Sequence, residues 1–250
     1  MRSEIEAAIA KLKKRKSPCV DNISAEEIQT AGSVGVDILF ELCRQIWNTE
    51  SFPQSWKKSV IVPIHKKSDR LCCNNYRGIS LLSHCEKVIA SVILQRIRTR
   101  TEELLSEAQA GFRARRSTID QLFTLRRLSE KYAEFGKYLY VCYIDFQKAF
   151  DSVWRAGLWH TMRFLGYNEK IVRVLQALYE NTMSAVRVDG GLTDWFATTV
   201  GVLQGCILSP LLFNILLEVV MALALDDEEL GARIAGVRIS NLQFADDIYI

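Results

Sequence analysis

The stretch Tyr138–Val153, "YLYVCYIDFQKAFDSV", begins as an apolar run and then reaches a carboxylate at Asp145. A second stretch, Leu242–Ile250, "LQFADDIYI", repeats this pattern with the pair Asp246 and Asp247. Their β-branched and aromatic residues predict strands over Leu139–Asp145, Leu242–Ala245 and Ile248–Ile250. An ionised carboxylate in apolar surroundings is costly unless it is paired or binds a metal ion. Both stretches therefore predict strands that end at a charged site.

The acidic pair is expected to form the two-residue turn of a hairpin, because Asp tolerates the dihedral angles of such turns. If the strand that ends at Asp145 neighbours this hairpin, the three carboxylates converge and raise one another's pKa unless a cation neutralises them. None of the three histidines falls beside them, and all-oxygen ligation favours Mg²⁺ or Mn²⁺ over zinc. Two such ions suit in-line phosphoryl transfer, in which one activates a 3′-hydroxyl and the other stabilises the leaving pyrophosphate.

Composition describes a folded chain with an uneven charge distribution. Of the 250 residues, 49% are hydrophobic and 24% are charged, which is typical of a core-forming protein of one large domain or two small ones. Residues 1–100 carry 17 Lys/Arg and 10 Asp/Glu, a net charge of +7, and the remainder carries 15 and 19, a net charge of −4. This asymmetry suits a protein that meets a polyanion on one side and holds metal carboxylates on the other, although scattered surface charge is an alternative.

The seven cysteines include no C-x-x-C pair, which indicates reduced thiols and not a disulfide framework. Cys72, Cys73, His84 and Cys85 invite a zinc interpretation, but their spacing fits no standard site. The apolar segment Ile207–Leu225 has about the length of a membrane span. Because it contains Ser209, Pro210, Asn214 and Glu218, a helix buried in a globular core is the better interpretation.

Other segments predict the elements around the acids. A helical pattern over Glu4–Lys16 ends in the basic run "KLKKRK", which is typical of a nuclear signal, a phosphate contact or a solvated helix end. A strand followed by a basic loop is expected in "SWKKSVIVPIHKKSDR", a loop at "NNYRGISLL", and a hairpin around Gly190-Gly191. Ser117 or Thr118 before Asp120 predicts a capped helix start, Asp151 a cap for a helix over Ser152–Leu165, and Ser209-Pro210 the start of the long apolar helix.

In this order, "YIDFQKAFDSV", "GVLQGCILSPLLFNILLE" and "FADD" resemble the catalytic motifs of a reverse transcriptase, in particular of the non-LTR (LINE-like) retrotransposon type. The upstream blocks "KSPCVDNISAEEI", "NNYRGISLL" and "AQAGFRARRSTIDQL" match as well, so that the resemblance covers Ser17 to Ile250.

The resemblance implies roles for particular residues. Asp145, Asp246 and Asp247 would be the catalytic acids, with Asp145, Asp246 and the Phe146 carbonyl binding two Mg²⁺ or Mn²⁺ ions. Phe150 would lie under the incoming sugar and exclude a 2′-hydroxyl, although an ordinary core aromatic is also consistent with it. The dNTP would further contact Lys66, Lys67, Arg77, Gln204 and Gly205, and the template backbone would contact Arg113, Arg115 and Arg116. A solvated loop is the alternative for the two lysines and a surface turn for the three arginines.

The fold implied is α+β, a right-hand polymerase with fingers and a ferredoxin-like palm sheet backed by helices. The expected division is a helical extension of the fingers over 1–54 and fingers plus palm over 55–250. The resemblance also implies a chain truncated after the acidic pair, without its thumb. Leu203, Cys19 and Ser24 replace an arginine, a glycine and a proline that related elements usually have, and Cys19 would matter if its turn requires a positive φ.

The resemblance implies an RNA template, a DNA primer and dNTPs as partners, no membrane, and action in the nucleus. It implies RNA-directed DNA polymerisation. The alternatives are an inactive truncated remnant that at most binds RNA, a group II intron maturase-type enzyme, or an RNA-dependent RNA polymerase. Phe150 and the "FADD" tip argue against the last of these.

Overall fold

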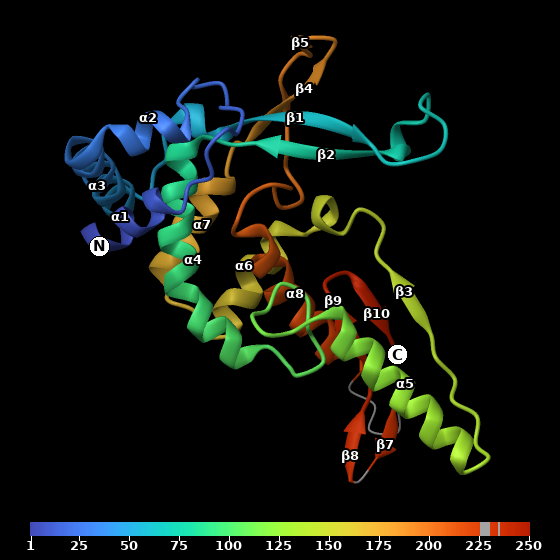
Figure 1. The fold of residues 1–250 in the computed structure, drawn as a ribbon. Coiled ribbons are helices and arrows are strands. Elements are labelled where there is room, and N and C mark those ends of the chain that lie inside the picture. Colours follow the sequence, from blue (N-terminus) through green and yellow to red (C-terminus); the bar gives the residue numbers. More distant parts are fainter. Residues whose placement is uncertain (226–230, 235) are drawn as a thin grey trace. The chain divides into compact units, whose positions relative to one another are not determined.

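The computed structural model describes residues 1–225, 231–234 and 236–250 (Figure 1). The chain divides into two compact units, one formed by Met1–Thr99 with Phe150–Ser209 and the other by Arg100–Ala149 with Pro210–Ile250. Two helices cross from one unit into the other, α4 (His84–Leu104) and α8 (Ser209–Ala224). The division expected at residue 54 stays a prediction, because the compact units are interleaved along the chain.

Unit 1 opens with a cluster of three helices, α1 (Arg2–Ala10), α2 (Ala25–Thr30) and α3 (Gly32–Thr49). They pack on one another through buried side chains such as Ile5, Leu39 and Ile46. Ser24 begins α2 with a capping box, since its hydroxyl accepts the Glu27 N–H and the Glu27 carboxylate accepts the Ser24 N–H. The helix predicted over Glu4–Lys16 is confirmed only in its first part, because α1 ends at Ala10 and the basic run lies beyond it.

A mixed sheet forms the second part of unit 1. Its strands are β1 (Lys58–His65), β2 (Tyr76–Leu81), β4 (Met183–Val188), β5 (Gly191–Leu192) and β6 (Phe196–Ala197). The order is β2-β1-β4-β5, with β6 also on β4; β1 pairs antiparallel with β2 and parallel with β4. The predicted strand β1 and the hairpin at Gly190 are confirmed. The "NNYRGISLL" segment was predicted as a loop and is instead strand β2, because its backbone pairs along β1.

Two further helices belong to this part of the chain, α6 (Arg155–Phe164) and α7 (Glu169–Tyr179). It also contains the short 3₁₀ helices η1 (Gln54–Lys57), η2 (Cys73–Asn75) and η3 (Ala149–Ser152). The fully buried residues Leu158, Met162 and Leu175 form the core between α6 and α7. The cap predicted at Asp151 is wrong, because α6 begins only at Arg155 and its N-cap is Trp154, without a side-chain cap.

Unit 2 contains α5 (Thr118–Glu134) and a small antiparallel sheet with the order β3-β10-β9. Its strands are β3 (Tyr143–Asp145), β9 (Leu242–Phe244) and β10 (Asp247–Tyr249), and β7 (Ala232–Ile234) pairs with β8 (Val237–Ile239). Helix α5 packs against β9. The capping box predicted at its start is confirmed at Ser117, whose N–H donates to the Asp120 carboxylate over 2.7 Å. Helices beside one mixed and one antiparallel sheet confirm the α+β class.

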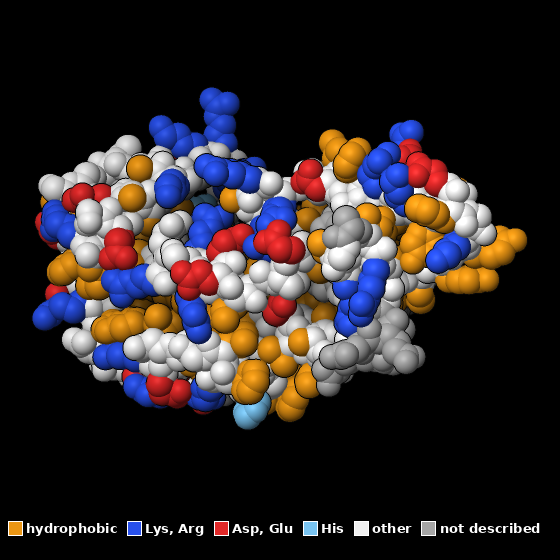
Figure 2. Space-filling model, turned by 90° about the horizontal axis from the view of Figure 1, so that it is seen from below, with side chains coloured by type: hydrophobic (Ala, Val, Ile, Leu, Met, Phe, Trp, Pro, Cys, Tyr) orange, Lys and Arg blue, Asp and Glu red, His pale blue; other side chains and the backbone are white. Residues whose placement is uncertain are grey.

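The strand predicted over Leu139–Asp145 is shorter than expected. Only Tyr143–Asp145 belongs to β3, and Cys142 adds two backbone hydrogen bonds with Ile250, of 2.8 and 3.0 Å. Residues 138–141 line an open, mostly apolar cavity of about 510 Å³ with side chains of α5. The exposed side chains of Tyr138 and Tyr140 belong to its lining, and hydrophobic side chains gather over the C-terminal end of α5 at the right of Figure 2. An apolar run predicts burial, but a strand also needs a partner strand.

The long apolar helix lies in a globular core. Its residues Leu212 and Ile215 are fully buried, and the helix begins at Ser209, one residue before the predicted start. Among the described residues, no helix is both long and apolar enough to cross a bilayer. All seven cysteines are free thiols, and Cys72 and Cys73 are exposed. Among the described residues, no three His, Cys, Asp or Glu side chains form a cluster that could hold zinc.

Candidate active site

Two of the three acids, Asp145 and Asp247, lie on neighbouring strands of unit 2, and Asp246 lies in the turn before Asp247. In the antiparallel register Asp247 is directly opposite Asp145, and Asp247 also pairs with Phe244 on the other side. The turn between β9 and β10 is therefore Ala245-Asp246, one residue earlier than the predicted Asp246-Asp247. Ala245 takes the positive φ of the turn, 57°, which the sequence assigned to an Asp. Strand pairing thus brings Asp145 and Asp247 together, with Asp246 next to them in the turn.

The electrostatics of this edge reflect three carboxylates close together. Asp145 and Asp247 are exposed and Asp246 is half-buried. Burial, followed by the charges of Asp246 and Asp145, raises the pKa of Asp247 above its usual value. None of the three carboxylates has a hydrogen bond or an ion pair with another described residue. Carboxylate oxygens that lie close together without a counter-charge are the type of donor that a hard divalent cation accepts.

The arrangement does not amount to a closed metal cage. In the described part of the chain, no group of three His, Cys, Asp or Glu side chains lies in ligand-like proximity. The carboxylate donors and their negative charge are of the type that a divalent cation binds, but they do not form a complete set of ligands. The Phe146 carbonyl predicted as a further ligand belongs to the residue directly after β3, whose side chain is 37% exposed.

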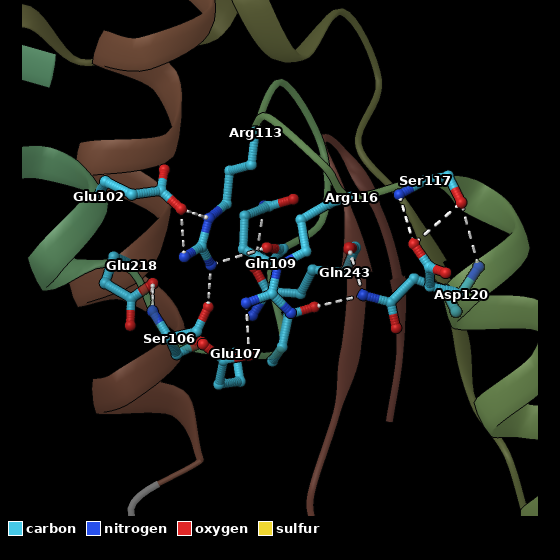
Figure 3. Close-up of polar contacts among 12 residues, drawn as sticks. Glu102, Ser106, Glu107, Gln109, Arg113, Arg116, Ser117, Asp120, Glu218 and Gln243 are labelled. Carbon is cyan, nitrogen blue, oxygen red and sulfur yellow. Dashed lines mark hydrogen bonds and ion pairs between the residues drawn. The ribbon is translucent and has the colours of Figure 1, made fainter. Parts of the chain in front are cut away.

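A buried network of carboxamides holds the acidic turn (Figure 3). The Gln109 side-chain oxygen accepts the N–H groups of Gly111 and Ala245 over 2.7 and 2.9 Å. The Gln109 amide donates to the Ala245 carbonyl and to Gln243 over 3.3 and 3.2 Å. Gln109 is therefore bonded to both backbone groups of the turn residue with positive φ, so it fixes the position from which Asp246 and Asp247 project.

The same segment is attached to its surroundings by further hydrogen bonds. Gln109 and Gln243 form an isolated parallel bridge, in which Ala110 N–H donates to the Gln243 carbonyl and Gln243 N–H to the Ala108 carbonyl over 2.9 and 2.8 Å. Gln121 on α5 donates to the carbonyls of Ala108 and Gln243. Gly111 is required at its position because a Cβ there would lie 2.1 Å from the Ala245 nitrogen. The "AQAGF" block is thus the support of the acidic hairpin.

The three arginines that follow this block differ from one another. The Arg113 side chain is only 4% exposed, and its guanidinium pairs with Glu102 and donates to the carbonyls of Ser106 and Gln109. Arg116 pairs with Glu107 at the surface. Arg115 is exposed and has no hydrogen bond or ion pair with a described residue. This geometry favours a structural role for Arg113 and leaves Arg115 accessible to an anion.

Two residues predicted to contact the nucleotide meet in unit 1. The Arg77 Nε donates to the Gln204 side-chain oxygen over 3.4 Å, and the Ser80 N–H donates to the Gln204 carbonyl over 2.7 Å. Gly205 has a φ of 119°, and a Cβ there would lie 2.6 Å from the Ser80 carbonyl oxygen. Strand β2 and the Gln204-Gly205 loop are therefore in direct backbone contact, as the glycine allows.

Phe150 lies in the same unit, next to this loop. Its carbonyl accepts the Val202 N–H over 2.7 Å, and its side chain is half-buried. Arg155 anchors the residues before the loop, since its guanidinium donates to the carbonyls of Thr198 and Gly201 over 2.7 and 2.9 Å. This half-buried anchor could not be foreseen, because an arginine at a helix start is usually a surface residue.

Lys66 and Lys67 directly follow β1, in the connection that joins it to β2. The Lys66 N–H closes the hairpin by donating to the Asn75 carbonyl over 2.8 Å, and both side chains are exposed. Arg77 pairs with Ile64, two residues before Lys66, so the two positions are roughly 7 Å apart along the strand. The structure brings Arg77 and Gln204 together but records no contact of either lysine with them.

The Gln109 contacts predict a positioning role. Replacing Gln109 with Ala leaves the N–H groups of Gly111 and Ala245 without their acceptor, which costs about 1–3 kcal/mol for each unsatisfied group. We expect a loss of about 3 kcal/mol in the free energy of unfolding in urea, and faster hydrogen exchange at the Ala245 amide. The exposed Gln45→Ala serves as the control, with a change within about 0.5 kcal/mol. Unchanged exchange at Ala245 in Gln109→Ala would contradict this role.

The raised pKa of Asp247 predicts a pH dependence. A carboxyl whose pKa is higher in the folded state destabilises the fold as the pH rises from the ordinary Asp value, about 4, through its folded pKa. Without divalent metal, Asp247→Asn should therefore melt at a higher temperature than the wild type at pH 7, and the gap should close toward pH 4. The exposed Asp194→Asn should show no such gap. Added Mg²⁺ should raise the melting temperature of the wild type more than that of Asp247→Asn. Equal melting temperatures at pH 7 and equal Mg²⁺ responses would refute the electrostatic assignment.

Comparison with known proteins agrees with the sequence motifs. The family described as "Reverse transcriptase (RNA-dependent DNA polymerase)" matches residues 64–250. A probable RNA-directed DNA polymerase from transposon BS of Drosophila melanogaster is 31% identical over 215 residues, which cover 85% of this chain and 24% of the relative. The RNA-directed DNA polymerase from mobile element jockey of the same species is 28% identical, over 85% of this chain and 23% of the relative. The chain thus spans about a quarter of the length of these relatives.

Solved structures support the fold. Apo telomerase from Candida tropicalis aligns with a TM-score of 0.57 at 15% identity, over 85% of this chain and 44% of that one. A form of the same telomerase truncated from its C-terminal domain aligns with a TM-score of 0.56 at 17% identity, over 86% and 48%. The polymerase fold expected from the sequence is confirmed. Because the family match covers most of the chain and the relatives are polymerases of mobile elements, the chain belongs to the reverse transcriptase family, of the type found in non-LTR retrotransposons.

Proposed function

We propose that this chain forms the polymerising region of a LINE-like reverse transcriptase, which extends a DNA primer on an RNA template with dNTPs. The observation that carries the proposal is the register of unit 2, where Asp145 and Asp247 are paired and Asp246 occupies the adjoining turn without a counter-charge. Family membership supplies the reaction class, and action in the nucleus is part of the proposal.

Asp145, Asp246 and the Phe146 carbonyl would hold two Mg²⁺ ions. When bound, such ions lower the pKa of a 3′-hydroxyl nucleophile and neutralise charge on the leaving pyrophosphate. Asp247 would add negative charge beside them and stay near the primer end. The Gln109 network keeps these oxygens in place, because a displaced acid loses alignment with the reacting atoms.

Residues of unit 1 would bind the nucleotide. Arg77 donates to Gln204 only through its Nε, so its terminal nitrogens remain available for a triphosphate oxygen. Lys66 and Lys67 would add positive charge to the same group. Gly205 would allow the loop backbone to approach the nascent base pair, and Arg115 and Arg116 would contact the template backbone.

Phe150 would exclude ribonucleotides. Its half-buried ring belongs to a segment that is hydrogen-bonded to the residues preceding Gln204. A ring packed under the sugar leaves no room for a 2′-hydroxyl, whereas it accepts a deoxyribose.

Two departures from the usual family motif fit the fold and do not favour the inactive remnant. Cys19 is buried and is not among the residues with positive φ, so its turn does not require glycine. Its thiol donates to the Leu81 carbonyl over 3.1 Å. Ser24 provides the capping box of α2. Both replacements therefore make contacts of their own within a folded unit 1.

Primer extension tests the proposed function. The purified chain is given poly(rA)·oligo(dT), dTTP and Mg²⁺, beside Asp145→Asn and Asp246→Asn. Each variant should lose about a thousandfold in rate, equivalent to about 4 kcal/mol of transition-state stabilisation, because a metal ligand is removed. RNA binding, measured by fluorescence anisotropy, should survive in both variants.

Asp194→Asn is the matched control, since it removes one exposed carboxylate outside the acidic hairpin. It should extend the primer at the wild-type rate. Wild-type-like extension by Asp145→Asn would refute the metal assignment. A folded wild-type chain that binds RNA and extends no primer would instead support the RNA-binding remnant.

Phe150→Ala tests the sugar discrimination. We expect the ratio of dTTP to UTP incorporation to fall by at least tenfold, since the cavity admits the 2′-hydroxyl. Phe164→Ala removes a ring that is 74% exposed on α6 and should leave this ratio unchanged. An unaltered ratio in Phe150→Ala, at normal stability, would identify Phe150 as a core residue only.

A further inference from the structure

The basic run Lys11–Lys16 lies along a groove of unit 1. The groove encloses about 820 Å³ between the segment after α1, strand β2, helix α4 and the loop at Gly205–Ile207. Six Lys or Arg residues line it, and its lining contains no Asp or Glu: Lys11, Lys13, Arg15, Lys16, Lys87 and Arg98. A concave surface with one sign of charge concentrates the opposite charge from solution.

Most other arginine side chains of unit 1 form ion pairs or hydrogen bonds with described residues, whereas the six cations of the groove do not. Arg44 pairs with Glu41, Arg96 with Glu4, and Arg173 with Glu50. No side-chain hydrogen bond or ion pair joins any of the six groove cations to another described residue. The fold therefore leaves this charge available for a ligand.

The basic segment is held in place by its backbone. The Gln29 side-chain amide donates to the carbonyls of Ile9 and Leu12 over 3.1 and 3.0 Å, and the Arg15 N–H donates to the Glu26 carboxylate over 2.6 Å. Helix α2 thus fixes the course of the segment along the groove. A pre-organised set of cations binds an anion at a lower entropic cost than a flexible tail does.

The interior of the groove combines charge with apolar surface. Lys87 is half-buried on α4, and burial lowers the pKa of its ammonium group. The apolar side chains of Ile79, Leu81, Leu94 and Ile207 line the same space. A bound phosphate would offset the free-energy cost of burying the Lys87 ammonium group, because it supplies an opposite charge. Sugars or bases would cover the apolar residues.

We propose that this groove binds the phosphate backbone of a single-stranded nucleic acid, and that the strand is the RNA template before it is copied. The second half rests on the proposed function. Ser80 and Gly205 line the groove and also form the loop contact next to Gln204, so a strand in the groove leads to the predicted nucleotide position.

An anionic membrane and a nuclear import receptor are two other partners for this basic run, and both fit the geometry less well. An anionic membrane would meet cations on a convex or flat face, whereas these surround a concavity. A nuclear import receptor would need to release the run from its hydrogen bonds to Gln29 and Glu26. A specific loss of oligo(U) binding in a groove variant would favour the nucleic acid over both of these partners.

The test measures binding of a fluorescent 20-nucleotide oligo(U) to the whole chain by anisotropy, at several salt concentrations. Lys13→Gln/Arg15→Gln/Lys16→Gln should weaken binding about tenfold or more and lower the slope of log K against log salt by about 2, near 0.7 for each lost phosphate contact. Arg44→Gln/Arg163→Gln/Arg173→Gln changes the net charge equally and should leave the slope unchanged. Lys14→Gln, outside the groove lining, should also bind normally.

Equal losses in the two triple variants would assign the effect to net charge and overturn the proposal. A groove variant that binds oligo(U) with the wild-type salt slope would also overturn the proposal. This holds even if the variant has lost binding to phosphatidylserine vesicles or to an import receptor. Circular dichroism confirms that the variants compared are folded.

A second experiment separates this proposal from the proposed function. Primer extension is compared on templates with 2 and 20 unpaired nucleotides ahead of the primer end. The groove variant should raise KM for the long template at unchanged kcat and leave the short template unaffected. If the wild type extends neither template, the proposed function fails while oligo(U) binding still decides the groove. Equal effects on both templates would contradict a template path in the groove.

Discussion

The acidic hairpin of unit 2 depends on one interaction, the pair of hydrogen bonds between the Gln109 carboxamide and the backbone of Ala245. Ala245 adopts a φ of 57°, which costs a residue with a Cβ about 1 kcal/mol or more. The carboxamide offsets this cost because it satisfies a donor and an acceptor that are both buried. A turn one residue later would move every side chain of β10 to the opposite face of the sheet. The pairing of Asp145 with Asp247 therefore follows from a neutral residue far away in sequence.

The distribution of paired and unpaired charges connects this hairpin with the groove of unit 1. Much of the surface charge is used in ion pairs such as Arg163 with Glu169, which are individually weak. The supports of the acidic turn, Gln109, Gln121 and Gln243, are uncharged, so they hold the acids without neutralising them. The acids of unit 2 and the cations of the groove are each left without opposite charges. Unpaired carboxylates are places where a cation can bind, and unpaired Lys and Arg side chains are places where an anion can bind.

The sequence predicted the elements whose signals are local, and it was less accurate where the deciding contact is remote. The Ser117 capping box and strand β1 were foreseen because their patterns lie within a few residues. The turn of the acidic hairpin was misplaced by one residue because Gln109, 136 positions away, stabilises Ala245 in the unusual conformation. Likewise Arg113 looked like one of three equivalent basic residues, and only its burial beside Glu102 distinguishes it. Assignments to metal, nucleotide and template stay predictions, because they depend on ligands as well as on the chain.

Strand β2 holds Cys19 in place and joins the groove to the Gln204-Gly205 loop. Arg77 near the start of this strand contacts the Gln204 side chain, and Ser80 near its end bonds the Gln204 backbone. The last residue, Leu81, lines the groove and accepts the Cys19 thiol, which attaches the segment that follows the basic run. A glycine at position 19 would lack this attachment. Since one short strand contacts the Gln204 loop and lines the groove beside the basic segment, a nucleic acid bound in the groove would lie against the same backbone that contacts Gln204.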